Sequence, residues 1–165
     1  AVLAIFNAAG RVVAGLASDV IGRVTAMAYV FTIQSVVMFS FGMLTSMPGL
    51  LAGTAFVGFS YGACLSLFPA KASDYWGTKN LGINYGILFT AWGVGGVFGP
   101  LLASTIADAT GSYTRAYQIA SGLLVVAIFL ALLSHISLSY NAEERQLVIK
   151  PGQKKPDAEM KDAAA

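Results

Sequence analysis

Two long stretches of this sequence carry no charged side chain, and they constrain the fold more than any other feature. Residues 24–70 and 82–107 contain no Asp, Glu, Lys or Arg. A hydrocarbon core about 30 Å thick is crossed by a helix of about 20 apolar residues, so each stretch can hold at least one crossing. Only 11% of the residues are charged and 56% are hydrophobic, whereas roughly a quarter are charged in a soluble domain. The sequence therefore predicts an all-α membrane protein.

Interruptions of the apolar pattern divide the chain into membrane helices and a tail. The sequence SMPG at residues 46–49 predicts a tight turn, and Pro69 is expected to end the third helix and open a polar loop. A transmembrane part is predicted over residues 1–139, with helices at about 1–17, 24–44, 50–68, 81–107 and 115–139. Residues 140–165 are rich in Lys, Glu, Asp, Gln and Pro, and they predict a disordered tail.

The composition argues against several other classes of protein. A net charge of +2, without a stripe of Lys and Arg interleaved with aromatic residues, gives no reason to expect a nucleic-acid partner. Cys64 is the single cysteine, so no internal disulfide, no cysteine-based metal site and no cofactor is expected. A membrane enzyme would need a nucleophile–base pair or a metal cluster, and one His with one Cys offers few residues that could form either. A channel would need a recurring polar or charged ring, and none recurs in the sequence.

The beginning of the chain and its basic residues carry topological information. Ala1 lies inside an apolar run without a methionine or a basic segment, which predicts a missing upstream part, with a processed terminus as the alternative. If the turn at Asp19 faces the cytoplasm, so do the polar loop and the tail, and only Arg115 lies on the opposite side. The cytoplasmic side then holds Arg23, Lys71, Lys79, Arg145, Lys150, Lys154, Lys155 and Lys161. This excess of positive charge predicts a cytoplasmic C-terminus.

A short charged motif joins the first two predicted helices. The sequence GLASDVIGR occupies residues 15–23. Two antiparallel helices that meet so tightly need small residues, and Gly15 and Gly22 supply them. Asp19 can face the positive end of a neighbouring helix, and Arg23 closes the pattern. A plain interfacial turn is the alternative interpretation.

The pattern G-x-x-x-D-x-x-G-R resembles the short cytoplasmic loop of the major facilitator superfamily, which joins its second and third helices and recurs between its eighth and ninth. Five spans followed by a charged tail resemble helices eight to twelve of that twelve-helix fold, over about residues 1–140. The sequences NAAGR at residues 7–11 and NYGILFTAWG at residues 84–93 are similar to the oxalate:formate antiporter family, which itself resembles monocarboxylate transporters.

The resemblance implies a protein of two six-helix halves, with the substrate bound between them near mid-membrane and alternating access by rocking of one half against the other. It also implies a bacterial inner-membrane location. The partners expected are the lipid bilayer, a small carboxylate substrate and the missing N-terminal part of the same transporter, without which this chain is not expected to transport.

Arg11 is the residue that most sharply predicts a ligand. It precedes Asp19 by eight residues, which is about 12 Å along a continuous helix and close to the middle of the membrane. A charge at that depth is costly and usually faces a watery cavity or a partner. A guanidinium can hold a carboxylate through two parallel hydrogen bonds, and Asn7, one turn earlier, could add a neutral donor. The alternative is an arginine that snorkels to the cytoplasmic edge or locks a gate.

Aromatic residues on two helices suggest the rest of a cavity. Tyr85, Phe89 and Trp92 share one face of the fourth predicted helix, and Tyr61 lies on the third together with Thr54. We hypothesise that the aromatic side chains line a substrate cavity, with helix packing or lipid contact as the alternative.

The number of visible cations bears on the substrate. The resemblance implies that carriers of dicarboxylates use a second positive charge on the penultimate helix, yet no basic residue occurs between Lys79 and Arg115. A monocarboxylate such as lactate, pyruvate or formate is therefore favoured over oxalate. A sugar or drug carrier of the same superfamily is the alternative.

Small residues predict close contacts between helices. Gly95 and Gly99 form a small-x-x-x-small pair, as do Gly58 and Gly62, and each pair allows two helix backbones to approach. Pro100 frees a backbone carbonyl and predicts a kink in the fourth helix.

Overall fold

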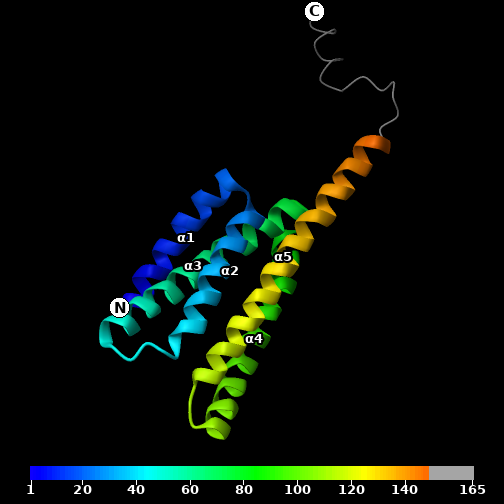
Figure 1. The fold of residues 1–165 in the computed structure, drawn as a ribbon. Helices are drawn as coiled ribbons and strands as arrows, with labels where there is room; N and C mark the ends of the chain where they lie inside the picture. The colour runs from blue at the N-terminus through cyan, green and yellow to red at the C-terminus, as the bar shows by residue number, and fades with distance from the viewer. Residues whose placement is uncertain (149–165) are drawn as a thin grey trace, which may run out of the picture. The chain divides into compact units, whose positions relative to one another are not determined.

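The computed structural model describes residues 1–148, which form five helices (Figure 1). The helices are α1 (Val2–Ile21), α2 (Arg23–Phe41), α3 (Met47–Trp76), α4 (Leu81–Thr110) and α5 (Thr114–Val148). Within these residues there is no strand, and all five helices are long and apolar enough to cross a membrane. The predicted all-α membrane fold is therefore confirmed.

The chain divides into two compact units, Ala1–Leu132 and Leu133–Ala165. The first unit contains α1 to α4 and the first part of α5. In the second unit, α5 continues to Val148, so it extends into the range 140–165 that was expected to be disordered. Residues 141–148 contain several good helix formers, which agrees with this extension. The remainder of the predicted tail lies outside the described residues.

The joint between α1 and α2 is a single residue. Gly22 has φ +89°, a conformation that glycine adopts without steric cost, and helix resumes at Arg23. Asp19 therefore lies in the last turn of α1 and not in a separate turn as expected. Because α1 is continuous from Val2 to Ile21, Arg11 does lie about 12 Å from Asp19 along one helix.

The predicted end of the third helix at Pro69 is wrong. Pro69 lies inside α3, which continues to Trp76 and ends where Gly77 adopts φ +72°. A proline in a membrane helix removes one backbone donor, and neighbouring groups can compensate for this loss. The helix begins where Ser46 caps it, with the Ser46 Oγ accepting from the Gly49 N–H at 3.3 Å. The extension reduces the expected polar loop to residues 77–80.

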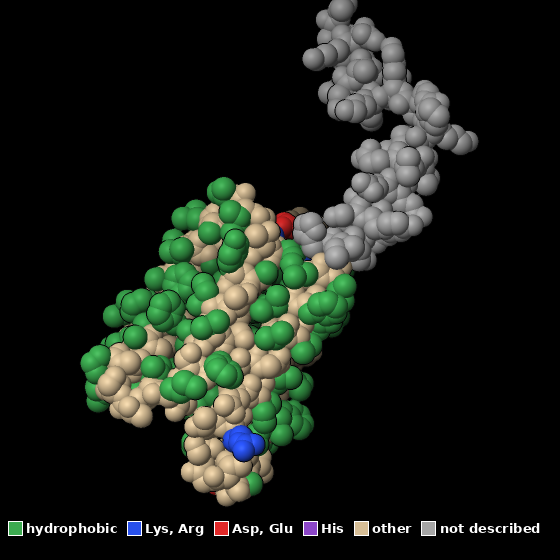
Figure 2. Space-filling view, in the orientation of Figure 1, with side chains coloured by type: hydrophobic (Ala, Val, Ile, Leu, Met, Phe, Trp, Pro, Cys, Tyr) green, Lys and Arg blue, Asp and Glu red, His purple; other side chains and the backbone are tan. Residues whose placement is uncertain are grey.

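Helix α3 is the centre of the first unit, because it packs against α1, α2 and α4. A buried cluster joins α1, α2 and α3 and consists of Ala14, Ala26, Met27, Val30, Phe31, Ala63 and Leu67. Hydrophobic side chains are spread over the helices of the visible face (Figure 2), as expected of a surface that meets lipid tails.

A reciprocal pair of serines connects α2 with α5. The Ser35 hydroxyl donates to the Ser121 carbonyl at 3.1 Å, and the Ser121 hydroxyl donates to the Ser35 carbonyl at 2.9 Å. Both side chains are buried.

Removing either serine hydroxyl should weaken the contact between α2 and α5 modestly. Ser35→Ala and Ser121→Ala should each lower the free energy of unfolding by about 0.5–1.5 kcal/mol, since hydrogen bonds between membrane helices average about 0.6 kcal/mol. The double variant should lose less than the sum of the two single losses, because the two hydroxyl oxygens also lie 3.0 Å apart and either variant removes that shared contact, whereas each hydroxyl's bond to the other serine's carbonyl survives. A double-mutant cycle in detergent micelles measures this coupling, and strictly additive losses would contradict the pairing.

Candidate substrate site

Helices α1 and α3 touch backbone to backbone. A Cβ atom added at Gly62 would overlap the carbonyl oxygen of Asn7, and one added at Gly58 would lie 2.6 Å from the carbonyl oxygen of Leu3. On the other side of the contact, a Cβ atom at Gly10 would overlap the carbonyl oxygen of Phe59. Only glycine fits at these positions without moving a helix.

The same contacts fix the depth of Arg11 relative to α3. The two helices run in the same direction, because Leu3 meets Gly58 and Asn7 meets Gly62. Farther along, Gly10 lies beside Ala63 and Gly15 beside Ser66. Arg11 is therefore level with residues 63–66, near the middle of α3.

Arg11 is held by its neighbour on the same helix. Its Nε donates to the Oδ1 of Asn7 at 3.1 Å, and the arginine side chain is exposed on the surface of the first unit. No carboxylate in the described part of the chain forms an ion pair with Arg11. The Asn7 Nδ2 is buried and has no hydrogen-bond partner among the described residues. The neutral Asn7 amide thus accepts from Nε and leaves the two terminal nitrogens of the guanidinium for an anion.

An apolar groove of about 440 Å³ lies between α3 and α4. It contains all four aromatic residues expected to line a cavity, Tyr61 from α3 and Tyr85, Phe89 and Trp92 from α4. The ring centroids of Tyr85 and Phe89 are 5.4 Å apart, and those of Phe89 and Trp92 are stacked at 4.9 Å with an interplanar angle of 21°. The structure therefore brings these four residues together, whereas Arg11 and Asn7 lie on α1, outside the groove lining.

Sequence reasoning missed the other lining residues of this groove. They are Cys64, Leu65, Phe68, Leu88 and Ala91. Most follow Tyr61 or Tyr85 at intervals of three, four or seven residues, so helical periodicity from the two tyrosines could have found them.

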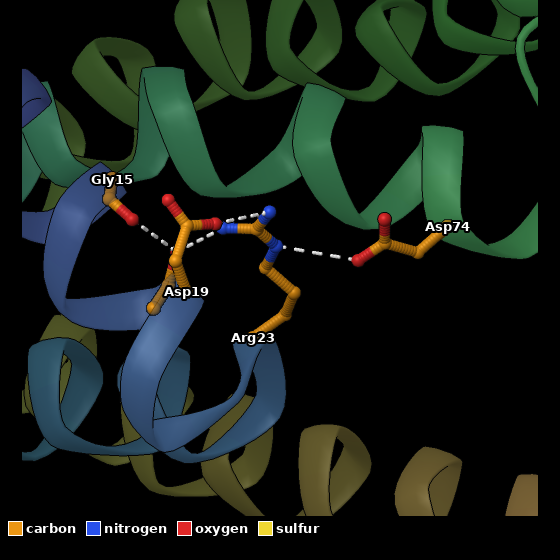
Figure 3. Close-up of polar contacts among 5 residues, drawn as sticks. Gly15, Asp19, Arg23 and Asp74 are labelled. Atoms are coloured by element: carbon orange, nitrogen blue, oxygen red, sulfur yellow. Dashed lines mark hydrogen bonds and ion pairs between the residues drawn. The ribbon is translucent and has the colours of Figure 1, made fainter.

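Apart from the candidate substrate residues, the loop motif forms a connected polar network around Arg23 (Figure 3). The Arg23 Nη2 lies 2.6 Å from the Asp19 Oδ1, and the Nε lies 3.2 Å from the Asp74 Oδ2. The Arg23 Nη1 also donates to the hydroxyl of Ser18, which in turn donates to the Gly15 carbonyl at 2.7 Å. One guanidinium thereby links the ends of α1, α2 and α3.

Asp74 was not singled out from the sequence. It lies 51 residues from Arg23 and belongs to no short motif, and Pro69 was expected to end the helix before it. Because α3 continues to Trp76, the Asp74 carboxylate reaches the start of α2.

Loss of Arg23 should be more damaging than loss of Asp74. The Asp74 side chain is 56% exposed, so Asp74→Asn should cost less than about 1 kcal/mol of unfolding free energy. Arg23→Gln loses both ion pairs and also the donor to the buried Ser18 hydroxyl, and it should cost about 1–3 kcal/mol, chiefly through Ser18 because Asp19 is as exposed as Asp74. Unfolding in detergent micelles measures both variants, and an equal or larger effect of Asp74→Asn would be the contrary result.

The sequence model described as Major Facilitator Superfamily matches residues 1–161. The chain belongs to this superfamily. Membership indicates a transporter rather than an enzyme, and together with the five apolar helices it indicates an integral membrane protein.

Several curated members of the superfamily are similar to this chain. The oxalate:formate antiporter of Oxalobacter formigenes is 33% identical over 129 residues, covering 77% of this chain and 31% of the antiporter. The uncharacterized MFS-type transporter YhjX of Escherichia coli (strain K12) is 32% identical over 98 residues, covering 58% of this chain and 24% of that protein. Monocarboxylate transporter 14 of Homo sapiens is 29% identical over 136 residues, covering 80% and 26% respectively. The chain thus spans about a quarter to a third of the length of these relatives.

The glycines of α4 differ from those at the α1–α3 contact of this superfamily member. A Cβ atom added at Gly95 or Gly99 would meet nothing within 4 Å beyond its own helix in the described structure. Pro100 lies inside α4, which continues to Thr110. Packing of this glycine pair against another helix therefore stays a prediction.

Proposed function

We propose that this chain is part of a secondary transporter that moves small organic anions by alternating access, with monocarboxylates such as lactate, pyruvate or formate favoured over oxalate. The observation that carries the proposal is the Arg11 guanidinium. It lies near the middle of an apolar helix, Asn7 holds its Nε, and no carboxylate of the described chain neutralises it. A charge in that position needs an anionic partner or water, and a substrate carboxylate fits its fork of donors.

The names of two relatives support the same class of ligand. One is an oxalate:formate antiporter and another is a monocarboxylate transporter. Helix α4 contains no basic residue, so the described part of this chain offers a single cation, Arg11, to the proposed site. One guanidinium matches one carboxylate, which favours a monocarboxylate.

In the proposed arrangement, α1 to α5 correspond to helices eight to twelve of the superfamily fold, and the N-terminal part supplies the opposite wall of the cavity. The network of Arg23 with Asp19 and Asp74 holds the ends of three helices together in one state and opens in the other. Gly22 is the joint about which α1 and α2 turn. The C-terminus lies in the cytoplasm, as the distribution of Lys and Arg favours. The membrane is a bacterial inner membrane, a location that the two bacterial relatives support.

A second candidate is a carrier of sugars or drugs, which the apolar aromatic groove favours because it needs no charge on its ligand. Counterflow in liposomes that carry the transporter containing this chain separates the two candidates. The organic-anion proposal predicts exchange of labelled pyruvate or lactate against unlabelled monocarboxylates. Exchange of labelled glucose or of a cationic dye, with no exchange of any carboxylate, would overturn it.

A further inference from the structure

We infer that the groove between α3 and α4 receives the apolar tail of the substrate, so that monocarboxylates with a branched or aromatic tail are preferred over formate. This inference rests on the proposed function, because it assumes that Arg11 holds the carboxylate. The inference adds the chemical character of the rest of the substrate, which is an apolar tail.

The chemistry of the groove defines the tail. All nine lining residues are uncharged, and their exposed surface in the groove is almost entirely apolar. A ligand pocket typically has a volume of about 300–1,000 Å³, so about 440 Å³ suits a small molecule with a carbon skeleton. Formate has no tail to fill this space, and oxalate would bring a second carboxylate into an apolar surface where no cation meets it.

The groove and Arg11 lie at the same depth. Arg11 is level with residues 63–66 of α3, and Cys64 and Leu65 of that segment line the groove. Tyr61 lines the groove and also an adjoining pocket that Leu3 of α1 lines, so the groove continues toward α1. Leu3, Asn7 and Arg11 follow one another at intervals of four residues and share one stripe of α1, on which Arg11 lies about 12 Å from Leu3.

The aromatic residues of α4 favour a flat or branched tail. Phe89 and Trp92 are stacked and present a broad apolar surface to the groove, with Trp92 51% and Phe89 37% exposed. A phenyl or isobutyl group laid on this surface would bury apolar area on both molecules. Each buried methylene should improve the affinity about fourfold.

Competition in counterflow tests the inference. Liposomes carrying the transporter that contains this chain exchange labelled pyruvate against unlabelled formate, pyruvate, 4-methyl-2-oxopentanoate, phenylpyruvate or oxalate. The apparent affinity should rise along the first four of these competitors by at least about 30-fold in total, and oxalate should compete no better than formate.

Variants show where the tail lies. Trp92→Ala and Phe89→Leu should each lower the preference for phenylpyruvate over pyruvate about tenfold. Phe98→Ala is the matched control, because Phe98 is an exposed aromatic residue of α4 that does not line the groove, and the preference should stay within about twofold. A preference that survives in both groove variants would overturn the inference.

Different results would contradict the proposed organic-anion function and the inferred binding of the tail. Formate could compete as well as phenylpyruvate while Arg11→Gln still abolishes exchange. This result would support the organic-anion function and contradict the binding of an apolar tail in the groove. In that case a lipid chain or a helix of the N-terminal part occupies the groove. If no carboxylate is exchanged at all, both the function and the inference fall.

Discussion

Arg11→Gln should reduce exchange of every monocarboxylate by at least about 30-fold and as much as several thousand-fold. Removing one member of a hydrogen-bonded charge pair costs about 2–5 kcal/mol, and each 1.4 kcal/mol is about a factor of ten. Gln retains a polar side chain of similar reach and loses the charge. Initial rates of uptake into liposomes, measured over a range of substrate concentrations, give the change in kcat/KM.

Arg11→Lys separates charge from geometry. Lysine retains the positive charge but cannot form two parallel hydrogen bonds with a carboxylate, and it cannot keep the contact of the Arg11 Nε with Asn7 in the same form. We expect a loss of about 10- to 100-fold, between wild type and Arg11→Gln. Arg115→Gln is the control, because Arg115 is exposed in the first turn of α5 and should be neutral within about twofold. Normal uptake in both Arg11 variants would end the carboxylate hypothesis.

Gly62→Leu should destabilise the first unit by about 3 kcal/mol or more. The new side chain would begin inside the carbonyl oxygen of Asn7, which is backbone and cannot rotate away, so α1 must separate from α3. Overpacking a well-packed contact costs about 1–3 kcal/mol even where side chains can adjust. Titration with SDS in mixed micelles, followed by circular dichroism, measures the loss of unfolding free energy.

The matched control for Gly62→Leu is Gly95→Leu. It makes the same change in another membrane helix, at a position where a Cβ atom meets nothing within 4 Å beyond its own helix in the described structure. In the isolated chain this variant should be neutral or stabilising by up to about 1 kcal/mol, because leucine is a better helix former than glycine. Equal destabilisation by both changes would contradict the backbone contact between α1 and α3.

Much of the fold was predictable because its cause is local. The charge-free stretches required membrane helices, and a break between the second and third of them was predicted. The turn expected at residues 46–49 is wrong in position, because α2 ends at Phe41 and Ser46 caps a helix that already begins at Met47, where a proline in the first turn is tolerated. The end of α3 was not predictable in this way. A proline ordinarily ends or kinks a helix in a soluble protein, whereas α3 continues past Pro69 to Trp76.

The candidate site was predictable to the extent that it depends on single helices. The spacing of Tyr85, Phe89 and Trp92 placed them on one face, and in the structure they line one groove. Their meeting with Tyr61 depends on how α3 packs against α4, which periodicity does not specify. The contact of Arg23 with Asp74 was out of reach for the same reason, because it joins the ends of α2 and α3 across 51 residues.

The distance between the substrate carboxylate and the Arg11 guanidinium is the most direct test of the function proposed here. Solid-state NMR on liposomes can measure it, with carbon-13 in the carboxylate of bound pyruvate and nitrogen-15 in the arginine side chains. We predict a carbon–nitrogen distance within about 4 Å, and loss of this dipolar coupling in Arg11→Lys. A coupling that is absent in the wild-type protein, or that persists unchanged in Arg11→Lys, would contradict binding of the substrate by Arg11.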